Sequence, residues 1–369
     1  MPRQNVFRDF GDAGALFRDE RALEPEYLPE LLPHRDAQVR EIASALRGAA
    51  QGRRPENVVA VGKPGTGKTA TVRFVFRQLS EYSGKAVPLY INCWEYSTRH
   101  AVLSRISHLL GEFMPRRGIA ADEILDRIVE VLKKEKKVAV VALDEIDRLL
   151  AGREGEEKVL YDLLRAGETY GTPFGVIGVT NNEDFLARLD RRIRSSLAQR
   201  EVAFRQYSPQ ELKDIIGARA RLSFHEGALS PEAVPLCAAH AAKNGGDARL
   251  GIAMLWKAGK LAEQQGAEKV SAAHCKKAFA AAEASIREEQ LSRLNGIERR
   301  IIGIAGESGG KGITSGELYE KLAKEFDETD RTVRNYIDKL EALKLVSVEE
   351  RPRTGAQKGN TRIIRIPTA

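Results

Sequence analysis

The sequence is poor in cysteine, and the few that occur are unsuited to a metal site or a disulfide framework. Its three cysteines, Cys93, Cys237 and Cys275, lie far apart and lack the spacing of metal ligands. The chain also has no run of about 18 apolar residues that could span a membrane, and no apolar signal core near Met1. We therefore expect a soluble cytoplasmic protein with reduced, buried thiols and no membrane partner.

Internal repeats and low-complexity segments are absent as well, which favours an ordinary globular protein. Its 369 residues are too many for one typical hydrophobic core and predict two or three domains. The net charge of +7 fits a polyanionic partner without identifying one, because many basic proteins bind none. Where the positive charge is concentrated is therefore more informative than its sum.

Short apolar runs alternate with helical patterns over the first half of the chain. Runs of continuous Val, Ile and Ala that are bounded by helices predict a parallel sheet covered on both faces. The expected strands are 58–61, 87–91, 138–143, 174–179 and 201–204. A helix is expected before them at 36–48, and others between them at 67–82, 101–113 and 121–134.

The pattern becomes entirely helical after Phe204. Ser208-Pro209-Gln210-Glu211 is a capping box with proline at the first helical position, and Ser230-Pro231-Glu232 repeats this start signal. We expect helices from here to about Ile286, which together form a small second domain.

The last eighty or so residues follow the order of a winged helix. Gly309–Gly312 separates two helices, and Thr314 with Glu317 caps the second of them. A longer helix is expected from Asp330 to Leu343, followed by a β-hairpin with strands at 346–348 and 361–365. The predicted organisation is an N-terminal extension over 1–20, an α/β domain over 21–206, a helical domain over 207–286 and a winged helix over 287–369.

One segment matches the phosphate-binding P-loop, G-x-x-x-x-G-K-[ST], in full. It is Gly62-Lys63-Pro64-Gly65-Thr66-Gly67-Lys68-Thr69, which follows a predicted strand and opens a predicted helix. The glycines allow backbone N–H groups to approach phosphates, and the helix N-terminus adds partial positive charge. Lys68 is expected to reach the β and γ phosphates and Thr69 to bind Mg²⁺, so ATP or ADP with Mg²⁺ is the predicted ligand.

Polar residues follow two other buried strands. Asp144 and Glu145 end the strand at 138–143, where Asp144 suits the Mg²⁺ shell and Glu145 suits the orientation of an attacking water. Asn181 follows the strand at 174–179 and is expected between Glu145 and the γ-phosphate. A turn-forming asparagine is the alternative, and neighbouring Asn182 leaves the position uncertain by one residue.

Two arginine sites come later in the chain. The segment Asp190–Leu197 holds three arginines, and a neighbouring subunit's arginine often neutralises the γ-phosphate during phosphoryl transfer. A solvated charge run explains this segment equally well. Arg249 begins a helix of the second domain and is expected to reach back to the nucleotide.

In this order of motifs the chain resembles AAA+ ATPases, and more closely the archaeal initiators related to the eukaryotic origin recognition complex and its cell-division-cycle partner. The matching segments are Tyr27–Arg35, Gly62–Thr69, Leu143–Asp147, Asp190–Leu197 and Gly246–Arg249. The resemblance implies an AAA+ P-loop domain with a parallel sheet, a small helical lid and a C-terminal winged helix. It also implies an ATP-regulated initiator with weak ATPase activity that binds double-stranded origin DNA, joins other initiator subunits or paralogues, and helps recruit the replicative helicase.

The resemblance further assigns individual residues. Pro33, His34 and Arg35 would lie near the adenine, beside a phosphate cradle made by Gly62, Pro64, Gly65, Thr66, Gly67, Lys68 and Thr69. Arg192 would be the arginine finger and Arg249 the sensor in the lid. The family usually has proline where this chain has Arg191, which leaves Arg191 and Arg194 as competitors of Arg192 for the finger.

The winged helix is the expected DNA-binding part. In this fold the third helix enters the major groove and the hairpin reaches the backbone or the minor groove. The predicted contacts are Arg331, Thr332, Arg334 and Asn335 on the helix and Arg351, Arg353, Lys358 and Arg362 on the wing, since Val333, Ile337, Leu340 and Leu343 form the buried stripe. Use of this domain for protein contacts is the alternative.

The helix after Gly118 would be the insertion found in initiators, and Arg116 and Arg117 before it are a second candidate DNA contact. Two other functions remain open at this point. A DNA motor of the branch-migration type also joins AAA+ to a winged helix, although no partner-binding hairpin is found in the predicted sheet. A transcription-regulating ATPase would normally carry long sensor repeats, which this chain lacks.

Overall fold

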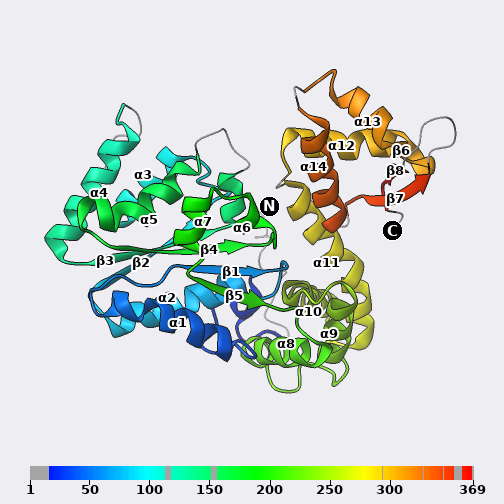
Figure 1. Ribbon diagram of the computed structural model, residues 1–369. Coiled ribbons are helices and arrows are strands. Elements are labelled where there is room, and N and C mark those ends of the chain that lie inside the picture. Colours follow the sequence, from blue (N-terminus) through cyan, green and yellow to red (C-terminus); the bar gives the residue numbers. More distant parts are fainter. Residues whose placement is uncertain are drawn as a thin grey trace, which may run out of the picture. The chain divides into compact units, whose positions relative to one another are not determined.

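The computed structural model describes residues 16–112, 118–150, 156–292, 294–326, 328–343, 345–352 and 360–367 (Figure 1). The described residues up to Phe279 form one compact unit, and those from Ala280 onward form another. Across these ranges no helix has the length and apolar character needed to cross a membrane.

The first unit is built on a five-stranded sheet with the order β2-β3-β4-β1-β5, and all its neighbouring strands are parallel. The strands are β1 (Val58–Gly62), β2 (Ala86–Asn92), β3 (Val138–Asp144), β4 (Phe174–Thr180) and β5 (Arg200–Phe204). Every residue of β1, β3 and β4 is buried, as expected for a parallel sheet with helices on both faces. The predicted α/β class and all five strands are confirmed.

Helices cover both faces of this sheet (Figure 1). Alternate residues of β1 enter opposite cores: Val58 and Ala60 pack with α1 and α2, whereas Val59 and Val61 pack with the helices of the other face. The first face carries α1 (Asp36–Ala50) and α2 (Lys68–Tyr82), and the second carries α3 (Arg99–Leu109), α4 (Ala121–Glu135), α5 (Lys158–Tyr170) and α7 (Arg191–Leu197). The sequence did not predict α5 and α7, nor the short helices η3 (Ile146–Leu149) and α6 (Phe185–Arg188).

A helical lid follows β5. It contains α8 (Pro209–Ser223), α9 (Ala233–Lys243), α10 (Ala248–Gln264) and the first turns of α11 (Ala272–Ser292). The capping box of Ser208 and Glu211 is formed as predicted. The second start signal was placed too early, because residues 231 and 232 form a turn and α9 begins at Ala233 without a side-chain cap.

The N-terminal segment is attached to the lid. Leu16 and Leu23 are 4% and 3% exposed, and the Phe17 ring lies 4.5 Å from that of Phe224 at the end of α8. Glu20, at the start of η2 (Glu20–Leu23), accepts a 2.6 Å hydrogen bond from Trp256 Nε1 on α10. The prediction of a loosely held extension over 1–20 was therefore wrong for residues 16–20, because Leu16 is buried, Phe17 packs on Phe224 and Glu20 binds Trp256, both far away in the sequence.

The second unit contains α12 (Gly296–Glu307), η4 (Gly309–Lys311), β6 (Ile313–Thr314), α13 (Ser315–Leu322), α14 (Asp330–Ala342), β7 (Ser347–Pro352) and β8 (Asn360–Arg365). The strands form a small antiparallel sheet with the order β6-β8-β7, of which the sequence did not predict β6. Val333, Ile337 and Leu340 point into the core as expected, whereas Leu343 follows the end of α14 and is half-buried. This arrangement fits the predicted winged helix.

Asn57 ties three parts of the first unit together just before β1. Its side chain is 1% exposed; Oδ1 accepts a 2.8 Å hydrogen bond from Val176 N on β4, and Nδ2 donates at 2.8 Å to Ser196 O on α7. Each of these backbone groups needs this partner, because an unpaired buried polar group costs about 1–3 kcal/mol.

We predict that Asn57→Ala lowers the free energy of unfolding of the first unit by about 2–4 kcal/mol, since two buried backbone groups lose their partner. Urea unfolding followed by tryptophan fluorescence measures this, because Trp94 and Trp256 both lie in that unit. The control is Gln78→Ala, at an exposed position of α2, which should leave the urea midpoint nearly unchanged. Equal midpoints for the two variants would contradict the prediction.

Candidate functional site

The P-loop connects β1 to α2 at the carboxyl end of the sheet. Gly65 and Gly67 have φ angles of 74° and 87°, in the left-handed region that favours glycine. Between them Thr66 is fully buried, and its Oγ1 donates a 2.8 Å hydrogen bond to Lys63 O. The loop therefore has a fixed shape, with the N-terminus of α2 at Lys68 directly behind it.

Lys68 lies at the centre of this loop. Its amine donates to Gly62 O at 2.6 Å, to Lys63 O at 2.9 Å and to Asn181 Oδ1 at 2.7 Å. Burial lowers the pKa of Lys68 from 10.5 to about 8, while the negative charge of Asp144 raises it again. The structure thus brings the predicted lysine and the predicted strand-end asparagine into direct contact.

Asp144 is held by two hydroxyl groups. Its Oδ2 accepts hydrogen bonds from Thr69 Oγ1 at 2.7 Å and from Tyr90 OH at 2.6 Å. Desolvation, together with the charge of Asp144, raises the pKa of Tyr90, so this phenol remains a donor. The hydroxyl of Thr69 and the carboxylate of Asp144 meet at one point beside Lys68.

Glu145 follows Asp144 in a sharp turn after β3. It has a φ of 56°, and its backbone N–H donates to Asp144 Oδ1 at 3.0 Å. Next to it Thr180, at the end of β4, donates through Oγ1 to Asp147 Oδ1 at 2.9 Å. The carboxyl ends of β3 and β4 therefore carry the acidic pair and Asn181 at the same edge as the P-loop.

Arg35 occupies the other side of the P-loop. The side chain is 2% exposed and donates to Thr66 O through Nε and to Arg205 O through Nη2, both at 2.9 Å. Its guanidinium carbon lies 3.8 Å from the centre of the Tyr207 ring. Arg35, which the resemblance places near the adenine, joins the P-loop to the segment between β5 and the lid.

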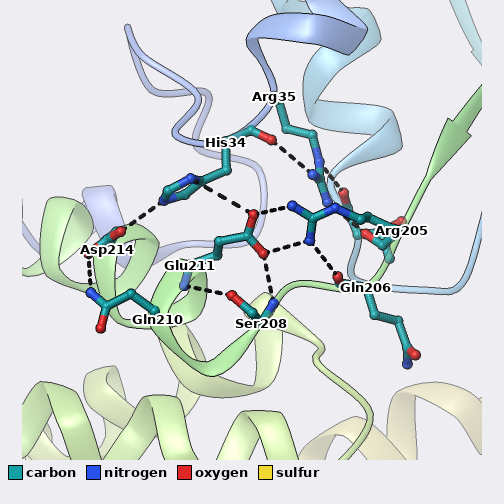
Figure 2. A network of polar contacts seen from close by, with 9 residues as sticks. His34, Arg35, Arg205, Gln206, Ser208, Gln210, Glu211 and Asp214 are labelled. Carbon is teal, nitrogen blue, oxygen red and sulfur yellow. Dashed lines mark hydrogen bonds and ion pairs between the residues drawn. The ribbon is translucent and has the colours of Figure 1, made fainter.

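His34 belongs to a polar network that reaches the lid (Figure 2). Its Nε2 hydrogen-bonds with Asp214 Oδ2 at 2.9 Å, and Nδ1 lies 3.9 Å from Glu211 Oε1, both on α8. Arg205 binds Glu211 through both terminal nitrogens, and these bonds lower the pKa of Glu211 to about 2. The network places His34 between the chain before α1 and the first helix of the lid. Pro33 directly precedes it.

The lid also touches the P-loop through the N-terminus of α10. Ala248 N donates to Gly65 O at 3.4 Å, and Asp247, the N-cap of the helix, lies against Gly65. Arg249 follows, and its positive charge is one of the causes that lower the pKa of Lys68. The predicted sensor is therefore close enough to the P-loop to act on its lysine.

The three candidate finger arginines lie on the surface. Arg191, Arg192 and Arg194 are exposed on α7, while Ile193 and Leu197 anchor the helix in the core. Within the part of the chain that the structure describes, their side chains have no hydrogen bond or ion pair. Among the described residues, no hydrogen bond or ion pair therefore joins these three side chains to the P-loop of their own unit.

The N-terminal half of α14 presents the predicted DNA contacts. Arg331, Arg334 and Asn335 are exposed, whereas Thr332 is half-buried and hydrogen-bonds through its N–H and hydroxyl to Thr329, the N-cap of the helix. Arg331, Arg334 and Asn335 therefore offer donors to a partner, while Thr332 contributes to the capping of α14.

The wing differs in part from expectation. Arg362 on β8 is half-buried and pairs with Asp338 Oδ1 at 2.6 Å and Glu350 Oε1 at 3.4 Å, so it ties the hairpin to α14. Arg351 belongs to β7, where its backbone pairs with Thr361. Arg353 and Lys358 on the wing and Arg116 and Arg117 before α4 lie outside the described residues.

Sequence reasoning missed several residues of the site. Tyr90, Tyr207 and Asp214 reach the P-loop region only through the fold, and no local motif marks them. The capping box marked Glu211 only as part of a helix start and not as part of this network. A signal existed for Asp247 alone, since it stands within the Gly246–Arg249 match, two residues before the predicted sensor.

Comparison with known proteins identifies the domains. A family model of the AAA ATPase domain matches residues 31–177, and a model of the Cdc6 AAA+ ATPase-type lid domain matches residues 213–280. The two matched segments include the P-loop, the acidic pair and Arg249, so the two family models cover these parts of the site.

Similar proteins extend over nearly the whole chain. The ORC1-type DNA replication protein 1 of Methanothermobacter thermautotrophicus is 35% identical over 373 residues, which cover 98% of this chain and 96% of that protein. Among solved structures, the Aeropyrum pernix ORC1 protein in complex with DNA has a TM-score of 0.78 at 32% identity, covering 95% of this chain and 93% of that one. The Aeropyrum pernix ORC2 protein, solved as ADPNP-ADP complexes, has a TM-score of 0.69 at 25% identity, with coverages of 95% and 94%.

The geometry of the P-loop, the lid and the winged helix agrees with these similarities along the chain. The protein therefore belongs to the ORC1/Cdc6-type family of archaeal replication initiators, which are ATP-binding AAA+ proteins.

Proposed function

We propose that this protein is an ATP-regulated initiator that binds double-stranded origin DNA through its winged helix and helps recruit the replicative helicase. The observation that carries the proposal is the contact of the lid with the P-loop at Gly65, next to the sensor Arg249. A nucleotide that binds at the P-loop acts on the position of the lid through this contact. The Aeropyrum pernix ORC1 protein, a similar structure that was solved in complex with DNA, supports DNA as the partner.

Mg²⁺ fits the residues beside Lys68. Thr69 Oγ1 and Asp144 Oδ2 are 2.7 Å apart, and hydroxyl and carboxylate oxygens are ligands that Mg²⁺ prefers. No group of three His, Cys, Asp or Glu side chains suited to a metal occurs among the described residues, which agrees with an ion that shares its shell with phosphates and water. In such sites Mg²⁺ neutralises charge that develops on the phosphates.

The remaining residues fit a weak, regulatory ATPase. In this proposal Lys68 binds the β and γ phosphates, Glu145 orients the attacking water, and Asn181 lies between Glu145 and the γ-phosphate. The exposed arginines of α7, of which Arg192 is favoured, fit a finger supplied to the neighbouring subunit. ATP hydrolysis then depends on assembly with other initiator subunits or paralogues.

DNA binding is assigned to α14 and the wing. Arg331, Arg334 and Asn335 are exposed on one helix whose opposite face is buried in the core, as a helix in the major groove requires. Arg351, Arg353 and Lys358 are proposed to contact phosphates, and Arg116 and Arg117 to form a second contact. Arg362 is proposed to contact DNA only through the part of its side chain that remains exposed beside its ion pairs with Asp338 and Glu350.

A cytoplasmic location agrees with the cysteines. Cys93, Cys237 and Cys275 are all buried and free, which is the usual state in a reducing compartment. The helicase as a partner follows from the family alone and belongs to the proposal.

We predict that Glu145→Gln retains ATP binding but lowers the rate of hydrolysis at least about 100-fold, since the attacking water loses its base. Radiolabelled ATP turnover, measured beside nucleotide affinity, separates these two effects. Lys68→Ala is the comparison variant and should lose affinity as well. Full hydrolysis by Glu145→Gln would show that another residue activates the water.

We predict that selection from a random duplex library, with ATP or ADP present, recovers a defined DNA motif. Selection by the Arg331→Ala, Arg334→Ala double variant should lose this motif, because the arginines that reach base edges are gone. Arg300→Ala is the control, since that arginine of the same unit is paired with Glu325 and Glu307. Sequence-blind or junction-preferring binding with fast DNA-stimulated hydrolysis would instead favour a motor.

A further inference from the structure

Asp247 and Arg249 form a local ion pair at the start of α10. Asp247 Oδ1 accepts a hydrogen bond from Arg249 N at 2.9 Å, which caps the helix. The guanidinium also binds the same carboxylate: Nη2 donates to Oδ2 at 2.7 Å and Nε donates to Oδ1 at 3.1 Å. The fork of the arginine side chain is thus turned back onto its own N-cap.

This pair lies against the phosphate-binding loop. A Cβ at Gly65 would overlap the Asp247 carboxylate and lie 2.8 Å from Asp247 Cα. Only glycine leaves room for the carboxylate here, and its φ of 74° also favours glycine. Both charges act on Lys68, where Arg249 lowers the pKa and Asp247 raises it. The carboxylate therefore lies where phosphate charge is expected.

Two features make the pair suited to exchange. The Arg249 side chain is 50% exposed and that of Asp247 is 16% exposed, so the ion pair is of the half-exposed kind that holds weakly. The donors that Asp247 occupies, Nε and Nη2, are the fork that binds a phosphate group through two oxygens. A γ-phosphate and the Asp247 carboxylate therefore compete for the same donors.

We propose that Asp247 is a positioning residue that holds Arg249 until a γ-phosphate displaces it. ATP offers the fork a group of higher negative charge than a carboxylate, whereas ADP lacks this group and leaves the pair in place. Asp247 thereby sets the threshold at which the lid distinguishes ATP from ADP. The proposal rests on the nucleotide-dependent lid of the proposed function and names the residue that regulates it.

A double-mutant cycle tests this competition. The affinities of nucleotide-free wild type, Asp247→Ser, Arg249→Ala and the double variant are measured by calorimetry for a non-hydrolysable ATP analogue and for ADP. Serine keeps the cap of α10 because it is also a favoured N-cap residue. Asp247→Asn is a second variant that keeps the cap and loses the charge.

We expect Asp247→Ser and Asp247→Asn to raise the ratio of ATP-analogue affinity to ADP affinity by about two- to fivefold, the size that a half-exposed ion pair supports. In the Arg249→Ala background, Asp247→Ser should leave the ratio of ATP-analogue affinity to ADP affinity unaltered. Loss of the Asp247 charge also removes its repulsion of bound phosphates, but this effect acts on both nucleotides. A ratio that stays the same or falls in Asp247→Ser with Arg249 present would overturn the proposal.

The first unit offers a matched control. Asp19 is the N-cap of η2, and its carboxylate accepts hydrogen bonds from Arg21 N at 3.2 Å, Nε at 2.9 Å and Nη2 at 3.0 Å. Asp19→Ser removes the same kind of pair elsewhere and should leave both affinities unchanged. A shift of the ratio in this variant equal to that of Asp247→Ser would likewise overturn the proposal.

The cycle separates this proposal from the wider function. One outcome is that Arg249→Ala lowers the ratio of ATP-analogue affinity to ADP affinity while Asp247→Ser does not raise it. In that case Arg249 senses the γ-phosphate, but Asp247 does not compete with the γ-phosphate for Arg249. If Arg249→Ala leaves the ratio unchanged, Arg249 does not sense the γ-phosphate, and both the sensor and the competition fail.

Discussion

A guanidinium buried among main-chain carbonyls holds the nucleotide loop to the rest of the molecule. Arg35 is 2% exposed and donates to the carbonyls of Thr66, His34 and Arg205, while its guanidinium carbon lies over the ring of Tyr207. Such a buried cation is stable only where each of its donors finds a fixed acceptor. The P-loop, the entry to α1 and the exit from β5 therefore keep one geometry relative to this side chain, and lysine could not replace its fork.

The lid is joined to the sheet at this same place. Residues 16–24 pack on the lid and residues 205–208 lead into it, so the chain passes between the two parts twice. Both connections meet in the network of Arg35, Arg205, Glu211 and His34 (Figure 2). In the proposed function, movement of the lid about this network would change the contact of α10 with Gly65 and so link the bound nucleotide to the lid.

The sequence predicted the parts that local patterns encode. Continuous apolar strands, the P-loop and the capping boxes depend on neighbours in the chain, and these elements lie within a few residues of where they were expected. The docking of Phe17 on Phe224 and the approach of Tyr90 to Asp144 had no such pattern, because each joins residues far apart in the chain. The pairing of Arg362 was hidden for the same reason, since a basic wing residue predicts contact with DNA rather than with Asp338.

The distance between lid and sheet is the most direct measure of whether nucleotide sets the position of the lid. Spin labels at Tyr82→Cys, at the end of α2, and Glu226→Cys, after α8, report it, because both positions are exposed and the native cysteines are buried. We expect different distance distributions with a non-hydrolysable ATP analogue and with ADP, and one common distribution for both nucleotides in Arg249→Ala. Identical distributions in the protein with Arg249 intact would contradict a nucleotide-dependent lid.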